Sequence, residues 1–391
     1  MQPANGADAY VLRTSAPLIG ALGSMRQHVW VLEEGPSLEA DCARGVVALA
    51  VLTDPPTIPA MKRLLTLCIL SLAACGQPEP AAEPVSTPSV WRDAAAHQER
   101  FVETNGVRLH VLDWGGTGPA LILIHGYGDS PHAFDDIAPA FTERFRVVAY
   151  ARRGHGRSTS GESFSNATLA ADLIGILDSL GIARASLAGW SMGGNEITAA
   201  AGLYPDRVEK IVYLDAGYDW SDPLFGAGLG DLPISIDPPA DARASLDAFK
   251  SWWIPTWWPG GDVRRVEAYL RDIGGLTPDG TLHPVPDSAN AARAIAALLS
   301  ERREYGKVTA RALAIYSDIF LSQPGKDSAA TAAIQAWEAK YAVPFRAASQ
   351  TRLRKELAGV ELATVPGSHA SFMFVSRDTV VALMTRFLLG G

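Results

Sequence analysis

Cysteine is scarce in this chain, which has 3 in 391 residues. The three stand far apart, at Cys42, Cys68 and Cys75. Only Cys75 remains if the chain is processed as we expect below, so the sequence predicts no disulfide framework. A domain without cross-links has to be held by its hydrophobic core, and this chain is long enough to form a large one.

The sequence also lacks the motifs of several enzyme classes. It has no His-Glu-x-x-His sequence and no Cys/His cluster, so a metal hydrolase has no support and we expect no metal. No glycine-rich phosphate loop follows a predicted strand, which argues against nucleotide-dependent chemistry and leaves no expected cofactor. The formal net charge of −8 gives no electrostatic reason to expect nucleic acid.

No apolar run stands out as long enough to span a bilayer, which takes roughly 20 residues. The clearest run, at residues 64–74, follows Lys62 and Arg63 and ends in small residues, which are the three parts of an export signal. Such a signal works at an N-terminus. We therefore interpret residues 1–60 as an upstream segment from a start assigned too early, and residues 61–74 as the signal peptide.

The sequence Leu72-Ala73-Ala74-Cys75 resembles the lipobox of bacterial lipoproteins. The resemblance implies cleavage before Cys75 and acylation of its sulfur. Residues 75–97 are rich in Pro, Ala and Glu and read as an extended tether. We therefore expect a lipid-anchored protein of the bacterial cell envelope, at the outer membrane because no Asp follows the cysteine.

From about residue 98 the sequence alternates between short apolar runs and helical patterns. The alternation predicts an α/β domain over residues 98–391, with a mostly parallel, doubly wound sheet. A hairpin is expected around Asn105-Gly106, and a helix over residues 132–145. The alternation stops at about residues 219–308, where helical patterns rich in Pro, Gly and Trp indicate an inserted cap.

The sequence Gly189-Trp190-Ser191-Met192-Gly193 has the pattern G-x-S-x-G between a predicted strand and a predicted helix. A nucleophile on such a tight turn has a strained backbone and needs small neighbours two positions away on each side. The turn presents the serine hydroxyl at a helix N-terminus. There the backbone N–H of Met192 can stabilise an oxyanion.

This turn from strand to helix, with its serine, is called a nucleophile elbow. With it the chain resembles the α/β-hydrolase fold family, from about residue 98 to the C-terminus. The resemblance also rests on the sequence His-Gly-Tyr-Gly at residues 125–128 and on residues 152–158. It implies that the backbone N–H of Tyr127 is the second oxyanion donor. It also implies that His125 and His155 hold loops rather than act on the substrate.

A serine hydroxyl needs a base within hydrogen-bond reach, most often a histidine. The resemblance implies that this base follows the last strand, where His369 stands. It implies a carboxylate after the sixth or the seventh strand, which makes Asp215 the first candidate and Asp318 the alternate acid. Asp318 stands two residues before the usual position, and Asp219 is a third candidate.

Tryptophans gather in the predicted cap, as Trp252-Trp253 and Trp257-Trp258, and Trp190 stands beside the nucleophile. Large flat apolar side chains over the site would favour an apolar or aromatic acyl or alcohol group, so we predict a substrate pocket lined by Trp190, Trp252 and Trp253. The alternative is that the cap tryptophans only attach the cap to the sheet.

Together these residues predict a cofactor-free serine hydrolase that cleaves an ester or related acyl bond of a small molecule through an acyl-enzyme. A serine in the elbow argues against the haloalkane dehalogenases and epoxide hydrolases of the same fold, which attack with an aspartate. Two alternatives stay open. One is a perhydrolase of the non-haem haloperoxidase type, which residues 189–194 resemble, and the other is a lipid-anchored binding module without turnover.

Overall fold

The computed structural model describes residues 93, 95–234, 238–258, 261–277, 279–282, 288–321 and 328–390. The predicted signal peptide, the proposed lipidation site Cys75 and most of the predicted tether lie outside these residues. None of the helices in the described part is both long and apolar enough to cross a bilayer.

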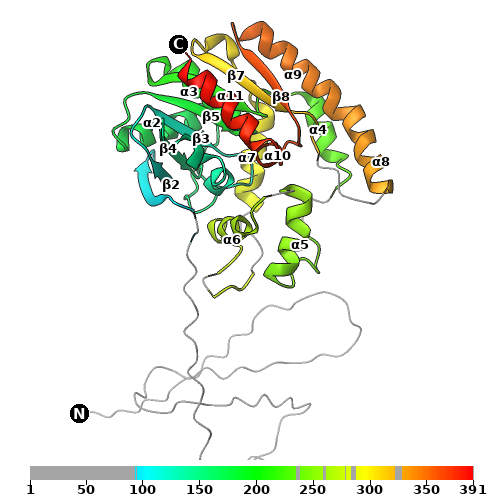
Figure 1. The fold of residues 1–391 in the computed structure, drawn as a ribbon. Helices are drawn as coiled ribbons and strands as arrows, with labels where there is room; N and C mark the ends of the chain where they lie inside the picture. The colour runs from blue at the N-terminus through cyan, green and yellow to red at the C-terminus, as the bar shows by residue number, and fades with distance from the viewer. Residues whose placement is uncertain are drawn as a thin grey trace, which may run out of the picture. The chain divides into compact units, whose positions relative to one another are not determined.

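An 8-stranded sheet forms the centre of the domain, in the spatial order β1-β2-β4-β3-β5-β6-β7-β8 (Figure 1). The strands are β1 (Gln98–Thr104), β2 (Val107–Gly115), β3 (Ala120–Ile124), β4 (Arg146–Tyr150), β5 (Ala185–Trp190), β6 (Val208–Leu214), β7 (Arg311–Ser317) and β8 (Glu361–Val365). β1 and β2 form an antiparallel hairpin that turns at Asn105 and Gly106. β2 is also antiparallel to β4, and all the other neighbours are parallel. The predicted α/β architecture is thereby confirmed.

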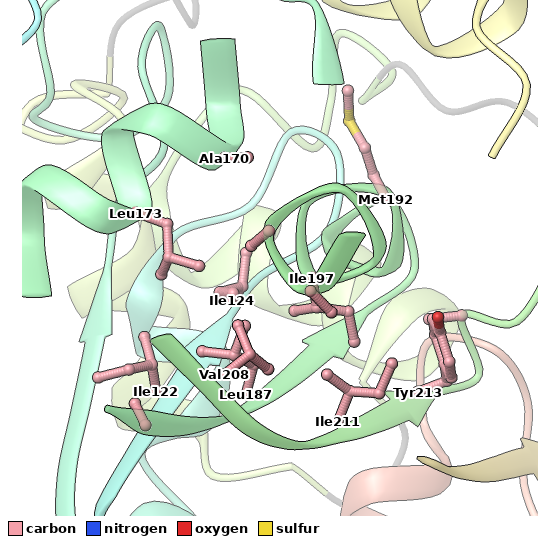
Figure 2. Close-up of a cluster of buried hydrophobic side chains, with 14 of the residues drawn as sticks. Ile122, Ile124, Ala170, Leu173, Leu187, Met192, Ile197, Val208, Ile211 and Tyr213 are labelled. Carbon is pink, nitrogen blue, oxygen red and sulfur yellow. The ribbon is translucent and has the colours of Figure 1, made fainter. Parts of the chain in front are cut away.

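Helices cover the sheet on both sides. They are η1 (Pro131–Phe134), η2 (Ala138–Phe141), α2 (Asn166–Ser179), α3 (Gly193–Leu203), η3 (Pro205–Arg207), α4 (Pro223–Gly230), α5 (Leu246–Trp257), α6 (Val263–Asp272), α7 (Ser288–Ser300), η4 (Tyr305–Lys307), α8 (Ser328–Trp337), η5 (Glu338–Ala342), α9 (Val343–Glu356), α10 (Phe372–Val375) and α11 (Arg377–Leu389). Ile122 and Ile124 of β3 pack in a cluster with α2 and α3 (Figure 2). Leu121 and Leu123 belong to a second cluster, with η1, η2 and α11. Side chains alternate along a strand, so both faces of the sheet are buried.

The helix predicted over residues 132–145 is wrong, because two short 3-10 helices, η1 and η2, take its place. Pro131 is the first residue of η1, and Pro139 lies in the first turn of η2. Proline lacks a backbone N–H and clashes with the preceding turn of a helix, so Pro139 prevents one continuous helix. The segment after β3 is therefore a short irregular connection close to the sheet.

Between β6 and β7 the described residues form the helices α4 to α7. α5 and α6 share an aromatic core of their own, in which Phe249, Trp258 and Tyr269 are buried. α7 instead contributes Ala294 and Leu298 to the cluster that contains Ile122, Ile124 and the helices α2 and α3. The helices α5 and α6, called the cap below, thus have an aromatic core distinct from the two clusters of the sheet, and α6 also contacts the main domain, through Asp272 with His110 of β2.

A buried ion pair anchors the loop at residues 152–158, and its loss is expected to destabilise the domain. Arg153 donates from Nε and Nη2 to the two carboxylate oxygens of Asp172, at 2.6 and 2.7 Å, and both side chains are buried. The substitution Arg153→Met leaves the Asp172 carboxylate buried without its cation, which typically costs about 3–5 kcal/mol. Urea denaturation should show a loss of about that size in the free energy of unfolding.

The matched control is Arg207→Met, because the ion pair of Arg207 with Asp178 is partly exposed, with side-chain exposures of 25% and 63%. An exposed pair contributes less than about 1 kcal/mol. If Arg153→Met and Arg207→Met lowered the free energy of unfolding equally, burial of the Arg153 ion pair would not explain the effect.

Candidate active site

Ser191 lies on the turn between β5 and α3, with a φ of 54° in the left-handed region that non-glycine residues seldom adopt. The turn is tight. A Cβ atom at Gly189 would lie 2.5 Å from the carbonyl oxygen of Gly193, and one at Gly193 would lie 2.4 Å from the carbonyl oxygen of Ile124. Backbone atoms cannot move aside as a flexible side chain can, so both glycines are required by the packing around Ser191.

His369 comes from the loop between β8 and α10, and its Nε2 lies 2.8 Å from Ser191 Oγ. Hydrogen bonds on both sides of the His369 backbone help to hold this loop. The backbone N–H of His369 donates to the carbonyl of Phe320 at 3.0 Å, and Trp190 Nε1 donates to the carbonyl of His369 at 3.0 Å. The imidazole is therefore positioned within hydrogen-bond reach of the hydroxyl, as a general base must be.

Asp215 follows β6, is fully buried and places its Oδ2 2.7 Å from His369 Nδ1. Its carboxylate also accepts hydrogen bonds from the backbone N–H and the hydroxyl of Ser317, and from the Tyr218 hydroxyl. Burial opposes ionisation of Asp215, but the hydrogen bond from His369 and the charges of His369 and Arg346 outweigh it and hold its pKa below the ordinary value. An ionised carboxylate at Nδ1 keeps that nitrogen protonated and leaves Nε2 free to accept the serine proton.

The two other carboxylates named from the sequence have different partners. Asp318 accepts a hydrogen bond from the backbone N–H of Gly367 at 2.9 Å, so it supports the loop that carries His369. Asp219 accepts from Arg352 at 2.7 Å. Of the three candidates, Asp215 is the one that the structure brings to the imidazole.

The segment that follows β3 lies against the serine. A Cβ atom at Gly126 would lie 3.1 Å from the Cβ of Ser191, so the backbone leading into Tyr127 lies beside the nucleophile. Met192 directly precedes α3, so its N–H is one of the free amide groups at a helix N-terminus. These two segments are where the sequence predicted the oxyanion donors. The partial positive charge of the helix N-terminus favours an anion there.

His125 and His155 have structural contacts. His125 Nδ1 lies 2.8 Å from the carbonyl of Gly126, and its Nε2 accepts from the backbone N–H of Arg152 at 3.1 Å. Burial lowers the pKa of His125 well below its ordinary value, and burial together with the charge of Arg152 lowers the pKa of His155 to about 4. Both imidazoles are therefore neutral at pH 7. They lie against each other, with ring centroids 5.4 Å apart, where the two loops beside the site meet.

Aromatic rings surround the imidazole of His369. Phe320 stacks on it with ring centroids 4.7 Å apart, and Trp190 and Trp220 each lie with centroids 6.0 Å away. Sequence reasoning found Trp190 but missed Phe320 and Trp220, because neither belongs to a motif. Phe320 stands three residues after β7, and Asp215 and His369 also follow strands of the sheet. This position after a strand was the one feature of the sequence that could have placed Phe320 near the site.

Trp252 and Trp253, predicted to line the pocket, pack within the cap. The ring of Trp253 stacks on Tyr269 and on Phe249, with centroids 5.3 and 5.6 Å apart, and Trp252 lies against Phe249 at 5.7 Å. The cap meets the loop beside Ser191 through a different residue, because the Tyr269 hydroxyl donates to the carbonyl of Gly128 at 2.8 Å. In this structure the two tryptophans thus help to form the cap core, and their role in a pocket stays a prediction.

Asp129 lies in the loop between β3 and η1, beside Ser191. It is expected to make the stability of the domain depend on pH. Its side chain is buried, and burial, with a smaller contribution from the charge of Asp272, raises its pKa to about 7. An unfolded aspartate titrates at about 3.9. Between these values the folded chain keeps a proton that the unfolded chain has released, so the free energy of unfolding falls as the pH rises through this range.

The substitution Asp129→Asn removes this titration. The free energy of unfolding of the variant, relative to the unsubstituted protein, should rise by about 1.4 kcal/mol per pH unit between about pH 4 and 7. Urea denaturation at pH 5 and pH 7 measures this difference, with Asp378→Asn, whose side chain is 93% exposed, as the control. If the free energy of unfolding of Asp129→Asn relative to the unsubstituted protein were the same at pH 5 and pH 7, the expected titration of Asp129 would be contradicted.

Comparison with known proteins supports the fold. Residues 119–258 match the alpha/beta hydrolase fold family. The chain is 36% identical over 198 residues to epoxide hydrolase A of Mycobacterium tuberculosis, a match that covers 47% of this chain and 57% of that protein. It is 27% identical over 218 residues to 2-(acetamidomethylene)succinate hydrolase of Mesorhizobium japonicum, with 52% and 70% of the two chains covered.

Among solved structures, the crystal structure of E-2-(acetamidomethylene)succinate hydrolase is similar with a TM-score of 0.55 and 24% identity, covering 75% of this chain and 99% of that one. The sequence matches are shorter than the structural one. They span 57% and 46% of the length of two of the curated relatives. What this chain shares with the solved structure is the arrangement of sheet and helices.

Proposed function

We propose that this chain, which has the α/β-hydrolase fold, is a serine hydrolase that cleaves an ester or related acyl bond. One observation carries the proposal: hydrogen bonds run from Ser191 Oγ to His369 Nε2 at 2.8 Å and from His369 Nδ1 to Asp215 Oδ2 at 2.7 Å. This order of hydroxyl, imidazole and buried carboxylate is the one that activates a serine for attack on a carbonyl.

In the proposed reaction Ser191 Oγ attacks the carbonyl carbon of the substrate, and its proton passes to His369 Nε2. The Asp215 carboxylate stabilises the imidazolium that forms. The imidazolium then protonates the leaving alcohol as the carbon–oxygen bond breaks, which leaves the acyl group on Ser191. A water molecule then attacks the acyl carbon and gives its proton to the same imidazole. The imidazolium returns a proton to Ser191 Oγ as the bond to the acyl carbon breaks, and the acyl group leaves as the carboxylic acid.

We assign the stabilisation of the negative charge that develops on the carbonyl oxygen to the backbone N–H groups of Met192 and Tyr127, which would donate hydrogen bonds to it. This assignment is supported by the position of Met192 at the start of α3 and by the approach of the Gly126 backbone to Ser191. Such donors are fixed before the reaction begins, so no reorganisation is needed when the charge appears. Removal of one donor of this kind typically costs about 10²–10³ in kcat.

The similarity to an epoxide hydrolase does not carry epoxide opening over to this chain. The epoxide hydrolases that the sequence resembles in fold attack with an aspartate, and this chain has Ser191 at that position. Attack of the Ser191 oxygen on an acyl carbon forms an acyl-enzyme, which is an ester that water can hydrolyse. The rings of Phe320, Trp190 and Trp220 beside His369 favour an apolar group on the substrate.

The proposal is tested with p-nitrophenyl esters of graded chain length, compared with lactones and amides. We expect hydrolysis of at least one ester series, and covalent labelling of Ser191 by a fluorophosphonate probe, mapped by mass spectrometry. Peroxide-dependent halogenation in acetate that exceeds ester hydrolysis would favour the perhydrolase alternative. A folded protein that the probe does not label at Ser191 would favour a binding module and overturn the proposal.

We also propose that the chain is attached to the bacterial envelope by acylation of Cys75, because the lipobox resemblance is followed by a tether-like segment. More than one acyl chain is needed for stable anchoring, which lipoprotein processing supplies. Mass spectrometry of the N-terminal peptide from membranes is expected to show acylated Cys75. An N-terminus before Met61 would contradict this processing.

A further inference from the structure

A second group of polar side chains lies apart from the three residues of the candidate active site. Asp93, His97 and His132 each offer one ligand atom, and these atoms all lie within 4.8 Å of one another. His97 Nε2 is 2.9 Å and His132 Nδ1 is 3.5 Å from the same Asp93 oxygen, Oδ2. The chain thus brings two imidazoles to one carboxylate, although His97 and His132 are 35 positions apart in the sequence.

A second carboxylate adjoins this group. Asp135 Oδ2 lies 3.0 Å from His132 Nδ1, and the side chains of Asp135, His132 and His97 are each only 6% exposed. Within the described residues, Asp135 Oδ1 is buried without a hydrogen-bond partner. Buried polar atoms normally have partners, so this carboxylate oxygen points to a contact beyond the protein's own hydrogen bonds.

The four side chains come from two segments that are far apart in the sequence. Asp93 and His97 belong to the segment just before β1, where Asp93 Oδ1 accepts from the backbone N–H of Ala95 at 2.9 Å. His132 and Asp135 belong to η1 and its last turn, and the Ser130 hydroxyl caps this helix. A surface depression lined by His97, Trp114 and Arg146, among others, reaches the cluster at His97.

We propose that Asp93, His97 and His132, with Asp135 as the fourth ligand, bind a single zinc ion. Two imidazole nitrogens together with carboxylate oxygens suit Zn²⁺, whereas Ca²⁺ and Mg²⁺ take oxygen ligands. At Zn–N and Zn–O distances of about 2.0–2.2 Å, the ligand atoms of a tetrahedral site lie roughly 3.3–3.6 Å apart. The contacts of 2.9 to 3.5 Å around Asp93 Oδ2 are close to that spacing.

Such an ion would join the start of the folded domain to η1, which directly follows the loop beside Ser191. Its role is structural, because it would tie together two segments that meet here through the contact of His132 Nδ1 with Asp93 Oδ2 and through the rings of His97 and His132, whose centroids lie 5.6 Å apart. A structural metal binds the folded chain and not the unfolded one, so its binding adds to stability. The proposal does not depend on the assignment of Ser191 and His369 to catalysis.

The test uses the full chain, stripped with a chelator and dialysed, and titrated with Zn²⁺ by isothermal calorimetry. We expect one ion per chain with a dissociation constant below about 1 μM, and a rise in the thermal unfolding temperature as Zn²⁺ is added. Co²⁺ in its place should give the intense visible absorption of a tetrahedral site.

Ligand variants decide whether the ion binds at this place. His97→Gln and His132→Asn should each weaken Zn²⁺ binding by at least about 100-fold, while the exposed-site control Asp378→Asn leaves it unchanged. Circular dichroism verifies that each variant is folded. In His132→Asn the amide can still donate to Asp135, so this variant separates loss of the metal from loss of the hydrogen bond.

Three results would overturn the proposal. The first is no Zn²⁺ binding by the folded chain, and the second is binding that the ligand variants leave unchanged, which means adventitious binding elsewhere. The third is a cluster whose loss lowers stability equally with and without Zn²⁺. In that case His132 is only a buried cation paired with Asp93 and Asp135.

Discussion

The substitution Ser191→Ala is expected to lower kcat for ester hydrolysis by on the order of 10⁴ or more. Alanine has no oxygen to form the acyl-enzyme, and His369 then has no hydroxyl proton to accept at its Nε2. The remaining activity would come from binding and from the oxyanion donors acting on water alone. Initial rates on the best p-nitrophenyl ester, together with the loss of fluorophosphonate labelling, measure the effect.

The expected loss is chemical and not a loss of folding. Ser191 has a φ of 54°, and alanine at that place carries the same backbone strain, so the free energy of unfolding should change little. The control is Ser300→Ala, an exposed serine whose hydroxyl donates to the carbonyl of Ala297. If Ser191→Ala kept more than about a tenth of the activity, another nucleophile would have to carry the reaction.

The second large effect is expected at Asp215. The substitution Asp215→Asn should lower kcat by on the order of 10⁴, as seen when the acid of a serine triad becomes an amide. The asparagine nitrogen would face His369 Nδ1 and donate to it, so the proton would move to Nε2. The imidazole would then present an N–H, and no acceptor, to Ser191 Oγ.

The matched control for this change is Asp318→Asn, which removes the charge of the alternate acid. Asp318 accepts from the backbone N–H of Gly367, and an asparagine oxygen can accept the same bond. We expect Asp318→Asn to keep activity within about tenfold of the unsubstituted protein. The reverse order of effects, with the larger loss at Asp318, would show that the loops rearrange when substrate binds.

Asp215 also contributes to the packing beneath the site, so its variant needs a measurement of stability. It accepts from Ser317 and from Tyr218, and Tyr218 in turn accepts from Arg346 at 3.0 Å. These partners are buried and would lose a charged acceptor. Urea denaturation separates a partly unfolded variant from a folded one with the wrong tautomer.

Short-range patterns in the sequence determined the fold class and the nucleophile. Alternation of apolar strands and helical segments predicts a parallel sheet, because strands buried on both faces have no polar face. The elbow is equally local, since Gly189 and Gly193 stand two residues from Ser191 and any Cβ there would meet backbone atoms. The helix expected over residues 132–145 is absent for a local reason too, because Pro139 interrupts the helical segment.

The choice of acid and the histidine–aspartate cluster were decided only by the tertiary structure. Asp215 and Asp318 both follow strands of one sheet, and nothing within a few residues of either shows which one reaches His369, 154 positions from Asp215. Asp93 and His97 meet His132 only because the segment before β1 lies against η1. Contacts of this kind depend on how separate elements pack, and residue spacing along the chain carries little information about that packing.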